Sequence, residues 1–184
     1  MRIFIGVEVS DGDLRQSLTA WQHRSESFLS ERWRMTKPDN LHLTLRFLGQ
    51  VEEHRIHEIA ENLPGWVSED KEISVESTTL KLLPSDEKVR VVALAFVNDP
   101  SLQLMVDKIN GGLNCLGFEK PDLPFLPHVS LARHKGKPLK EFDVQEISWP
   151  QDVSVRLNIC AVTIFSSESS DNGVVYRPLF SHPL

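Results

Sequence analysis

Cysteines are scarce in this chain: Cys115 and Cys160 are the only two among 184 residues. One falls in an apolar segment with helical spacing and the other in an apolar strand pattern, so we expect buried free thiols rather than a disulfide. Free thiols are typical of a reducing compartment. Because Glu8 also interrupts the first apolar run too early for a signal peptide, we expect a cytoplasmic protein.

Long apolar runs and metal-binding clusters are also lacking. No stretch approaches the roughly 20 apolar residues that a membrane helix needs, so we expect no membrane attachment. His54 and His57 lie one helical turn apart, but a solvated helix face explains them better than a metal site. The Cys and His clusters of zinc sites are missing, and we expect neither a metal nor a cofactor.

Two common catalytic signatures do not occur. A glycine-rich phosphate loop is missing, which argues against a P-loop nucleotide hydrolase. Ser130 lacks the glycine elbow of a serine hydrolase, and its neighbour His128 has no evident Asp partner.

Excess basic charge is missing as well. The chain has 20 Lys and Arg against 26 Asp and Glu, a formal net charge of −6. Non-specific nucleic-acid binding depends on many basic contacts, so a large surface of that kind is excluded, whereas recognition of one phosphate at a strand end is not. The 40% hydrophobic composition is that of an ordinary globular protein. We expect a single domain over residues 1–184, formed by two interleaved lobes, and a monomer.

The most informative stretch that is present covers residues 41–49, Leu-His-Leu-Thr-Leu-Arg-Phe-Leu-Gly. Apolar residues alternate with His42 and Thr44, which predicts a β-strand with one face in the core and an imidazole beside a hydroxyl on the other. The pattern returns 86 residues later as His128 and Ser130, with Val129 and Leu131 facing away. One such histidine is more often structural than catalytic, but two copies favour catalysis.

Each motif also follows an apolar strand and a helix at similar spacing. Ile3 precedes His42 by 39 residues and Val91 precedes His128 by 37. Two β-α-β units related by an approximate two-fold axis would bring the two imidazoles to opposite sides of one groove. β-α-β patterns are common enough to match by accident, and only the motifs favour the repeat. We therefore expect an α+β fold with two lobes, mainly antiparallel sheets, outer helices and a groove between the lobes.

Two imidazoles facing one groove suit phosphodiester cleavage without a metal. At one pH the first can be neutral and accept a proton while the second is charged and donates one. Thr44 and Ser130 would then donate hydrogen bonds to the non-bridging phosphate oxygens, which carry the charge of the transition state. The alternative for both hydroxyls is a hydrogen bond to a neighbouring strand.

The two motifs, the opening Met-Arg-Ile-Phe-Ile-Gly-Val-Glu-Val and the closing Val-Tyr-Arg-Pro-Leu at 175–179 resemble the 2H phosphoesterases, and within them the bacterial and archaeal RNA 2′,3′-cyclic phosphodiesterases, also described as 2′-5′ RNA ligases. The resemblance covers nearly the whole chain. It implies metal-independent opening of RNA 2′,3′-cyclic phosphate ends to 2′-phosphomonoesters, with possible reverse ligation. It also implies His42 as the general acid and His128 as the base, an order that the residues alone leave open.

Two further residues are candidates for binding the substrate. Arg133 matches a position that the resembled family uses for the phosphate, yet strict alternation puts it on the face opposite His128 unless the strand ends or bulges after Leu131. Phe47 could stack on a nucleobase, although its alternation favours the core, and the same alternation puts Arg46 on the His42 face. Two alternatives to the RNA enzyme stay open: a phosphodiesterase for another small cyclic nucleotide, and a non-catalytic module that binds RNA ends.

The remaining patterns predict three helices and a C-terminal strand pair. A first helix begins at a capping box of Ser10 and Asp13 and reaches Phe28. A second ends at Pro64-Gly65, and a third is capped by Asp99 and ends at Gly117. The C-terminal strands are expected at 153–165 and 173–179, joined by a hairpin loop at 166–173.

Overall fold

The computed structural model describes residues 1–29, 31–67, 71–140, 142, 147–150, 153–170 and 173–184. In these ranges the chain forms three α-helices, α1 (Gly12–Ser25), α2 (Glu53–Val67) and α3 (Pro100–Cys115), and the short 3-10 helix η1 (Pro38–Asn40). The strands are β1 (Arg2–Glu8), β2 (Trp33–Met35), β3 (His42–Gln50), β4 (Ile73–Leu83), β5 (Val91–Phe96), β6 (His128–His134), β7 (Arg156–Ile159), β8 (Ala161–Ser170) and β9 (Gly173–Pro183).

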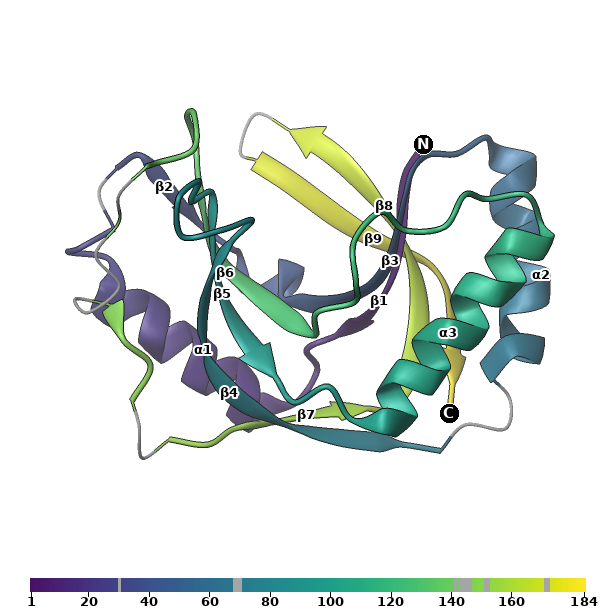
Figure 1. The fold of residues 1–184 in the computed structure, drawn as a ribbon, viewed down its shortest axis with the longest axis horizontal. Coiled ribbons are helices and arrows are strands. Elements are labelled where there is room, and N and C mark those ends of the chain that lie inside the picture. The colour runs from purple at the N-terminus through teal and green to yellow at the C-terminus, as the bar shows by residue number, and fades with distance from the viewer. Residues whose placement is uncertain (30, 68–70, 141, 143–146, 151–152, 171–172) are drawn as a thin grey trace.

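The strands follow one path, in the order β7-β4-β5-β6-β3-β1-β8-β9, with β2 beside β6 (Figure 1). Every strand pairing in the described ranges is antiparallel. In the described ranges the strand ladder between β3 and β6 has one residue pair, Leu43 and Val129. The expected α+β fold with antiparallel strands is therefore confirmed, and its two halves belong to one continuous sheet path.

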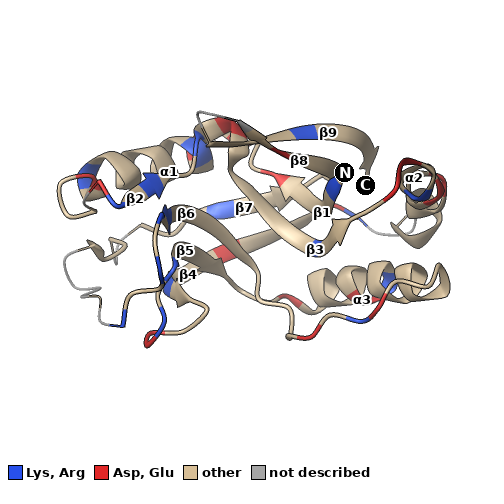
Figure 2. Ribbon diagram, turned by 90° about the horizontal axis from the view of Figure 1, so that it is seen from above, with Lys and Arg blue, Asp and Glu red and all other residues tan. Residues whose placement is uncertain are grey.

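The strand order also shows the predicted two-fold relation. In one half β1 pairs with β3 and α1 connects them, and in the other β5 pairs with β6 and α3 connects them. Each helix contacts the opposite half, α1 on β6 and α3 on β3. The indole of Trp21 in α1, for example, donates to the carbonyl of Ile147 at 3.1 Å. In Figure 2, α1 lies at one end of the molecule, and α2 and α3 lie at the other.

The core extends over both halves. Ile3, Leu43, Leu94 and Val129 on the central strands are all fully buried, as the alternation along each strand requires. Each of the described helices is too short or too polar to cross a lipid bilayer.

The first helix differs from its prediction at both ends. Its N-cap is Asp11, whose carboxylate accepts from the backbone N–H groups of Asp13 and Leu14, so the capping box at Ser10 is wrong. The helix ends at Ser25. Phe28 is 53% exposed and Leu29 is buried in its place, because the chain leaves the helix before the apolar spacing can continue.

The second helix continues past its predicted end. Pro64 lies inside α2, which runs on to Val67. Trp66 packs against Gly112 of α3 so closely that a Cβ on Gly112 would lie 2.1 Å from the indole ring. Packing of the last turn against α3 outweighs the hydrogen bond that proline cannot make.

The C-terminal strands and the cysteines also need correction. The expected strand at 153–165 is divided into β7 and β8, and β8 pairs with β9 as far as Ser170 and Gly173, so the predicted hairpin loop is mostly strand. Residues 171–172 lie outside the described ranges. Cys115 and Cys160 are free as predicted but exposed rather than buried, one at the end of α3 and the other between β7 and β8.

Candidate active site

His42 is held by the backbone before it and by its own motif. Its Nδ1 lies 2.7 Å from the carbonyl oxygen of Asn40, and its Nε2 lies 3.1 Å from Oγ1 of Thr44. A carbonyl only accepts, so Nδ1 carries the proton, and Nε2 of the neutral ring accepts from the Thr44 hydroxyl. The ring therefore presents Nε2 to the face that it shares with Thr44.

Aromatic rings surround the same imidazole. The ring centroid of Phe4 lies 4.7 Å away, and that of Tyr176 lies 4.8 Å away, edge-on. The side chain of Asn40 holds β9, which carries Tyr176, next to the motif. Its Nδ2 donates to the carbonyl of Val174 at 2.7 Å, and its Oδ1 accepts from the backbone N–H of Tyr176 at 3.2 Å. Sequence reasoning did not list Tyr176 as a site residue, although it is the only tyrosine in the chain.

His128 repeats the Nδ1 contact of His42 in the other half. Its Nδ1 lies 2.8 Å from the carbonyl oxygen of Leu126, again two residues back, so the same tautomer follows. Val129 is paired with Leu43, and extending that antiparallel register places His42 opposite the second motif's hydroxyl and His128 opposite the first motif's. The histidines are then diagonal neighbours, about 7–8 Å apart between Cα atoms.

A β-bulge in β6 decides the direction of Arg133. Ser130 is paired with Ala93 and Ala132 with Val92, so Leu131 is an extra residue. The next pair joins Arg133 to Val91, two positions from Ala93 on β5, which puts Arg133 on the face of Ser130. The sequence set the condition that the strand ends or bulges after Leu131, whereas the bulge lies at Leu131 itself and still brings Arg133 to the face of Ser130. The side chain of Gln22 on α1 donates to the Leu131 carbonyl at 2.8 Å and so holds the bulge.

A second bulge lies at the equivalent place in β3. Thr44 is paired with Gly6 and Arg46 with Ile5, which makes Leu45 the extra residue. Phe47 is then paired with Phe4 and shares the face of His42, where it is 49% exposed. Arg46 turns to the other face and donates to the carbonyl of Glu119. The expectations that Phe47 is a core residue and that Arg46 faces the groove are both wrong, because strict alternation takes no account of the bulge.

Burial and positive charge shift the pKa values of His42, His128 and Tyr176. Burial lowers the pKa of His42 to about 4, with the Asn40 carbonyl opposing this and the charges of His128 and Arg133 adding to it. Burial also lowers the pKa of His128, against the carbonyl of Leu126 and with the help of Arg133. For Tyr176, burial raises the pKa and the charge of Arg133 lowers it. Arg133 acts on all three groups, so the site favours an anion although the chain is acidic.

The depressed pKa of His42 predicts loss of stability in acid. The unfolded chain takes up a proton at His42 near pH 6.5 and the folded chain only near pH 4, so the free energy of unfolding falls as pH decreases between these values. Between pH 7.5 and pH 4.5, the free energy of unfolding measured in urea should therefore fall by about 2–3 kcal/mol less in His42→Asn than in the wild type. The same change at the exposed His57 is the control, and an unaltered pH dependence in His42→Asn would contradict the shift.

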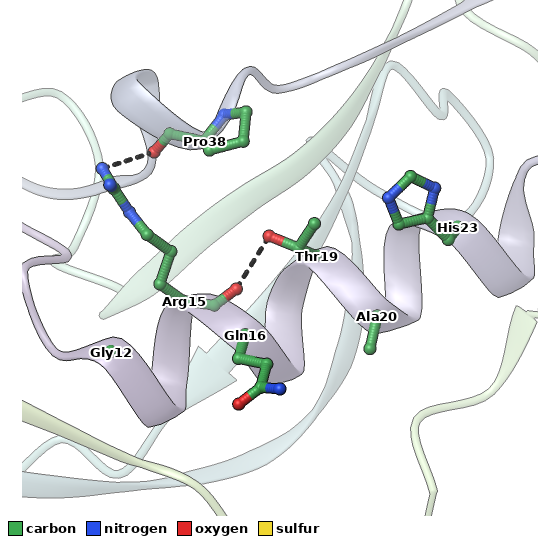
Figure 3. Close-up of a pocket in the computed structure, with 7 residues that line it drawn as sticks. All are labelled: Gly12, Arg15, Gln16, Thr19, Ala20, His23 and Pro38. Carbon is green, nitrogen blue, oxygen red and sulfur yellow. Dashed lines mark hydrogen bonds between the residues drawn. The ribbon is translucent and has the colours of Figure 1, made fainter.

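A hollow elsewhere on the surface contains none of the predicted site residues. It follows the outer face of α1 from Gly12 to His23 and reaches Pro38 (Figure 3). The guanidinium of Arg15 donates a hydrogen bond to the carbonyl of Pro38 at 3.1 Å. The hydroxyl of Thr19 donates to the carbonyl of Arg15 at 2.8 Å. Metal ligands do not gather here either: across the described residues, no three His, Cys, Asp or Glu side chains form a cluster that could hold an ion.

Comparisons with known proteins show which family the chain resembles. Residues 7–93 match the profile of a family described as LigT like Phosphoesterase. An RNA 2′,3′-cyclic phosphodiesterase of Thermotoga maritima is 27% identical over 181 residues, which cover 98% of this chain and 94% of that protein. The protein of the same name from Aeropyrum pernix is 30% identical over 151 residues, which cover 77% of this chain and 81% of that protein.

A solved structure shares the fold. The crystal structure of E. coli LigT complexed with 3′-AMP superposes with a TM-score of 0.76 and 22% identity, covering 100% of this chain and 97% of the other. The sequence profile and the relatives show that the chain belongs to the LigT-like phosphoesterases, the 2H family that its two motifs indicated.

Proposed function

We propose that this protein hydrolyses the 2′,3′-cyclic phosphate ends of RNA and leaves a 2′-phosphomonoester. The observation that carries the proposal is the diagonal pair His42 and His128, which share one face and one tautomer beside the charge of Arg133. The relatives from Thermotoga and Aeropyrum that carry the name RNA 2′,3′-cyclic phosphodiesterase support the substrate class.

In the proposed reaction Nε2 of His128 accepts a proton from water as the water oxygen bonds to phosphorus. The bond from phosphorus to O3′ breaks, Nε2 of His42 donates its proton to O3′, and the phosphate remains on O2′. Thr44 and Ser130 donate to the non-bridging oxygens, and Arg133 balances their negative charge. Phe47, exposed on the same face, supplies an aromatic surface for the base.

The acid role of His42 depends on the substrate. With a pKa of about 4 the ligand-free imidazole is neutral at pH 7, and the Thr44 hydroxyl donates to its Nε2. A cyclic phosphate between the histidines brings a negative charge that stabilises the imidazolium and raises this pKa. Binding of the anion then takes up the proton that the leaving oxygen needs.

Reverse 2′-5′ ligation follows from the same roles, with a ribose 5′-hydroxyl in place of water, because microscopic reversibility allows both directions. We propose that residues 1–184 act as one monomeric unit, since each half of the sheet path supplies one histidine. RNA ends carrying the cyclic phosphate are the proposed partners.

The proposed activity is expected to persist in EDTA. In the part of the chain that the structure describes, the reacting groups are imidazoles, hydroxyls and a guanidinium, and none of them needs a divalent ion to act. Turnover of a dinucleotide 2′,3′-cyclic phosphate should be measured with and without chelator, beside 3′,5′-cyclic and linear analogues. Loss of turnover on chelation, restored by a divalent cation, would contradict the mechanism.

The same assay separates the alternatives. A non-catalytic RNA-end module would bind the cyclic dinucleotide and return it unchanged. A phosphodiesterase for another small cyclic nucleotide would prefer the 3′,5′-cyclic analogue.

A further inference from the structure

A second arginine lies beside Arg133 on the neighbouring strand. Arg34 of β2 is paired with Arg133 of β6, and directly paired residues point to the same face of a sheet, with Cα atoms about 4.5–5.5 Å apart. The flanking pair, Trp33 and His134, is buried on the opposite face with the ring centroids 5.3 Å apart. This packing fixes the orientation of β2, so Arg34 lies on the same face as Arg133 and is exposed.

The guanidinium of Arg34 lies close to the start of β9. A Cβ on Gly173 would lie 3.2 Å from one terminal nitrogen of Arg34 and 3.6 Å from its Cζ. Gly173 has a φ of 109° and begins β9, three residues before Tyr176. Arg34 thus extends from the half of the sheet that holds His128 to the hairpin that forms the wall around His42. A side chain at position 173 would displace it.

Arg34 differs in its partners from Arg156 and Arg177, two other arginines of the surface. Arg156 pairs with Glu76 at 2.5 Å and Arg177 with Glu168 at 3.1 Å, whereas the described residues offer Arg34 neither a hydrogen bond nor an ion pair. In Figure 2 acidic colour dominates α2 and the segment after α3, at the end of the molecule away from β2 and β6. The N–H donors of Arg34 are therefore available to a second anion, next to the phosphate whose charge Arg133 is proposed to balance.

We propose that Arg34 binds the internucleotide phosphate on the 5′ side of the terminal nucleotide, so that the site selects oligonucleotide ends over mononucleotides. The inference rests on the proposed function. When the cyclic phosphate lies between the histidines, the next negative charge along an RNA chain is this phosphodiester. Arg34, on the strand next to that of Arg133, is placed to bind it. Arginine suits the role because its planar fork donates two hydrogen bonds to one phosphate.

The test compares substrates with one and two phosphates. Arg34→Gln should lower kcat/KM for a dinucleotide ending in a 2′,3′-cyclic phosphate about tenfold, mainly through KM, as expected for one lost charge-assisted contact. For a nucleoside 2′,3′-cyclic phosphate the rate should change less than about twofold, and Arg34→Lys should retain most of the dinucleotide rate. Arg24→Gln, an equal change of charge on α1, should leave both rates unchanged.

Two further readouts locate the contact at the phosphate itself. A neutral methylphosphonate in place of the internucleotide phosphate should reduce the wild-type rate to that of Arg34→Gln and leave the variant unaffected. The salt dependence of dinucleotide binding should lose about 0.7 from its logarithmic slope in the variant, the value for one phosphate contact on a single strand.

Equal losses on both substrates would overturn the inference, because Arg34 would then support the reacting centre or the hairpin. Equal rates for wild type and Arg34→Gln on the dinucleotide would also overturn it. The Kd values of the dinucleotide 2′-phosphate and the nucleoside 2′-phosphate measure the same contact without turnover. A protein that turned over neither cyclic phosphate would contradict the proposed function, and the ratio of these Kd values would still decide the role of Arg34.

Discussion

His42→Ala and His128→Ala are each expected to lower kcat for a 2′,3′-cyclic phosphate dinucleotide by about two to four orders of magnitude. Removal of a positioned acid or base has effects of this size. The duplicated geometry motivates the prediction: the Nδ1 of each imidazole is fixed by the carbonyl two residues back. Steady-state turnover with chelator present measures it.

Folding must be checked beside activity, because His42 lies among Phe4, Phe165 and Tyr176. Circular dichroism and the urea midpoint of each variant serve this purpose. The exposed His57 on α2 supplies the matched control, and His57→Ala should keep wild-type turnover. A folded His42→Ala or His128→Ala that kept turnover near the wild type would show that the two-histidine mechanism is wrong.

The second large effect distinguishes the acid from the base. A phosphodiester with a nitrophenolate leaving group needs no protonation of that group, so His42→Ala should lose most of its defect on such an ester while His128→Ala keeps its own. The ratio of the two residual rates on the ester and on the cyclic phosphate is the measurement. Rescue of His128→Ala would reverse the roles. Rescue of neither would mean that at least one histidine positions the phosphate without transferring a proton.

The pH profile should show the same division. Since kcat/KM reports the free enzyme and burial lowers the pKa of both His42 and His128, its optimum should lie below the ordinary histidine value of about 6.5. The optimum of kcat should lie higher, because the bound anion raises the pKa of His42. Loss of the base should remove mainly the acidic limb and loss of the acid mainly the alkaline limb. Coincident optima for kcat and kcat/KM would contradict the coupling between substrate binding and His42.

The fold class and the faces of the two motifs could be predicted from local sequence patterns. Alternation placed Leu43 and Val129 in the core and His42 and His128 on the opposite face, because the period of a strand is a local property of the backbone. The spacing of strand, helix and motif also indicated the two-fold relation, since each unit is continuous in the chain. Asp99 and Gly117 marked the limits of α3 through their own preferences for the ends of a helix.

The side chains that surround the two histidines depend on which strands pair with the motif strands. Bulges at Leu45 and Leu131 turn Phe47 and Arg133 to the histidine face, and a bulge exists only relative to a partner strand that the sequence of one strand does not specify. Arg34 comes beside the second motif through the pairing of β2 with β6, and Tyr176 comes beside the first motif through the approach of β9. The low pKa of His42 has the same origin, since burial depends on what surrounds a group in space.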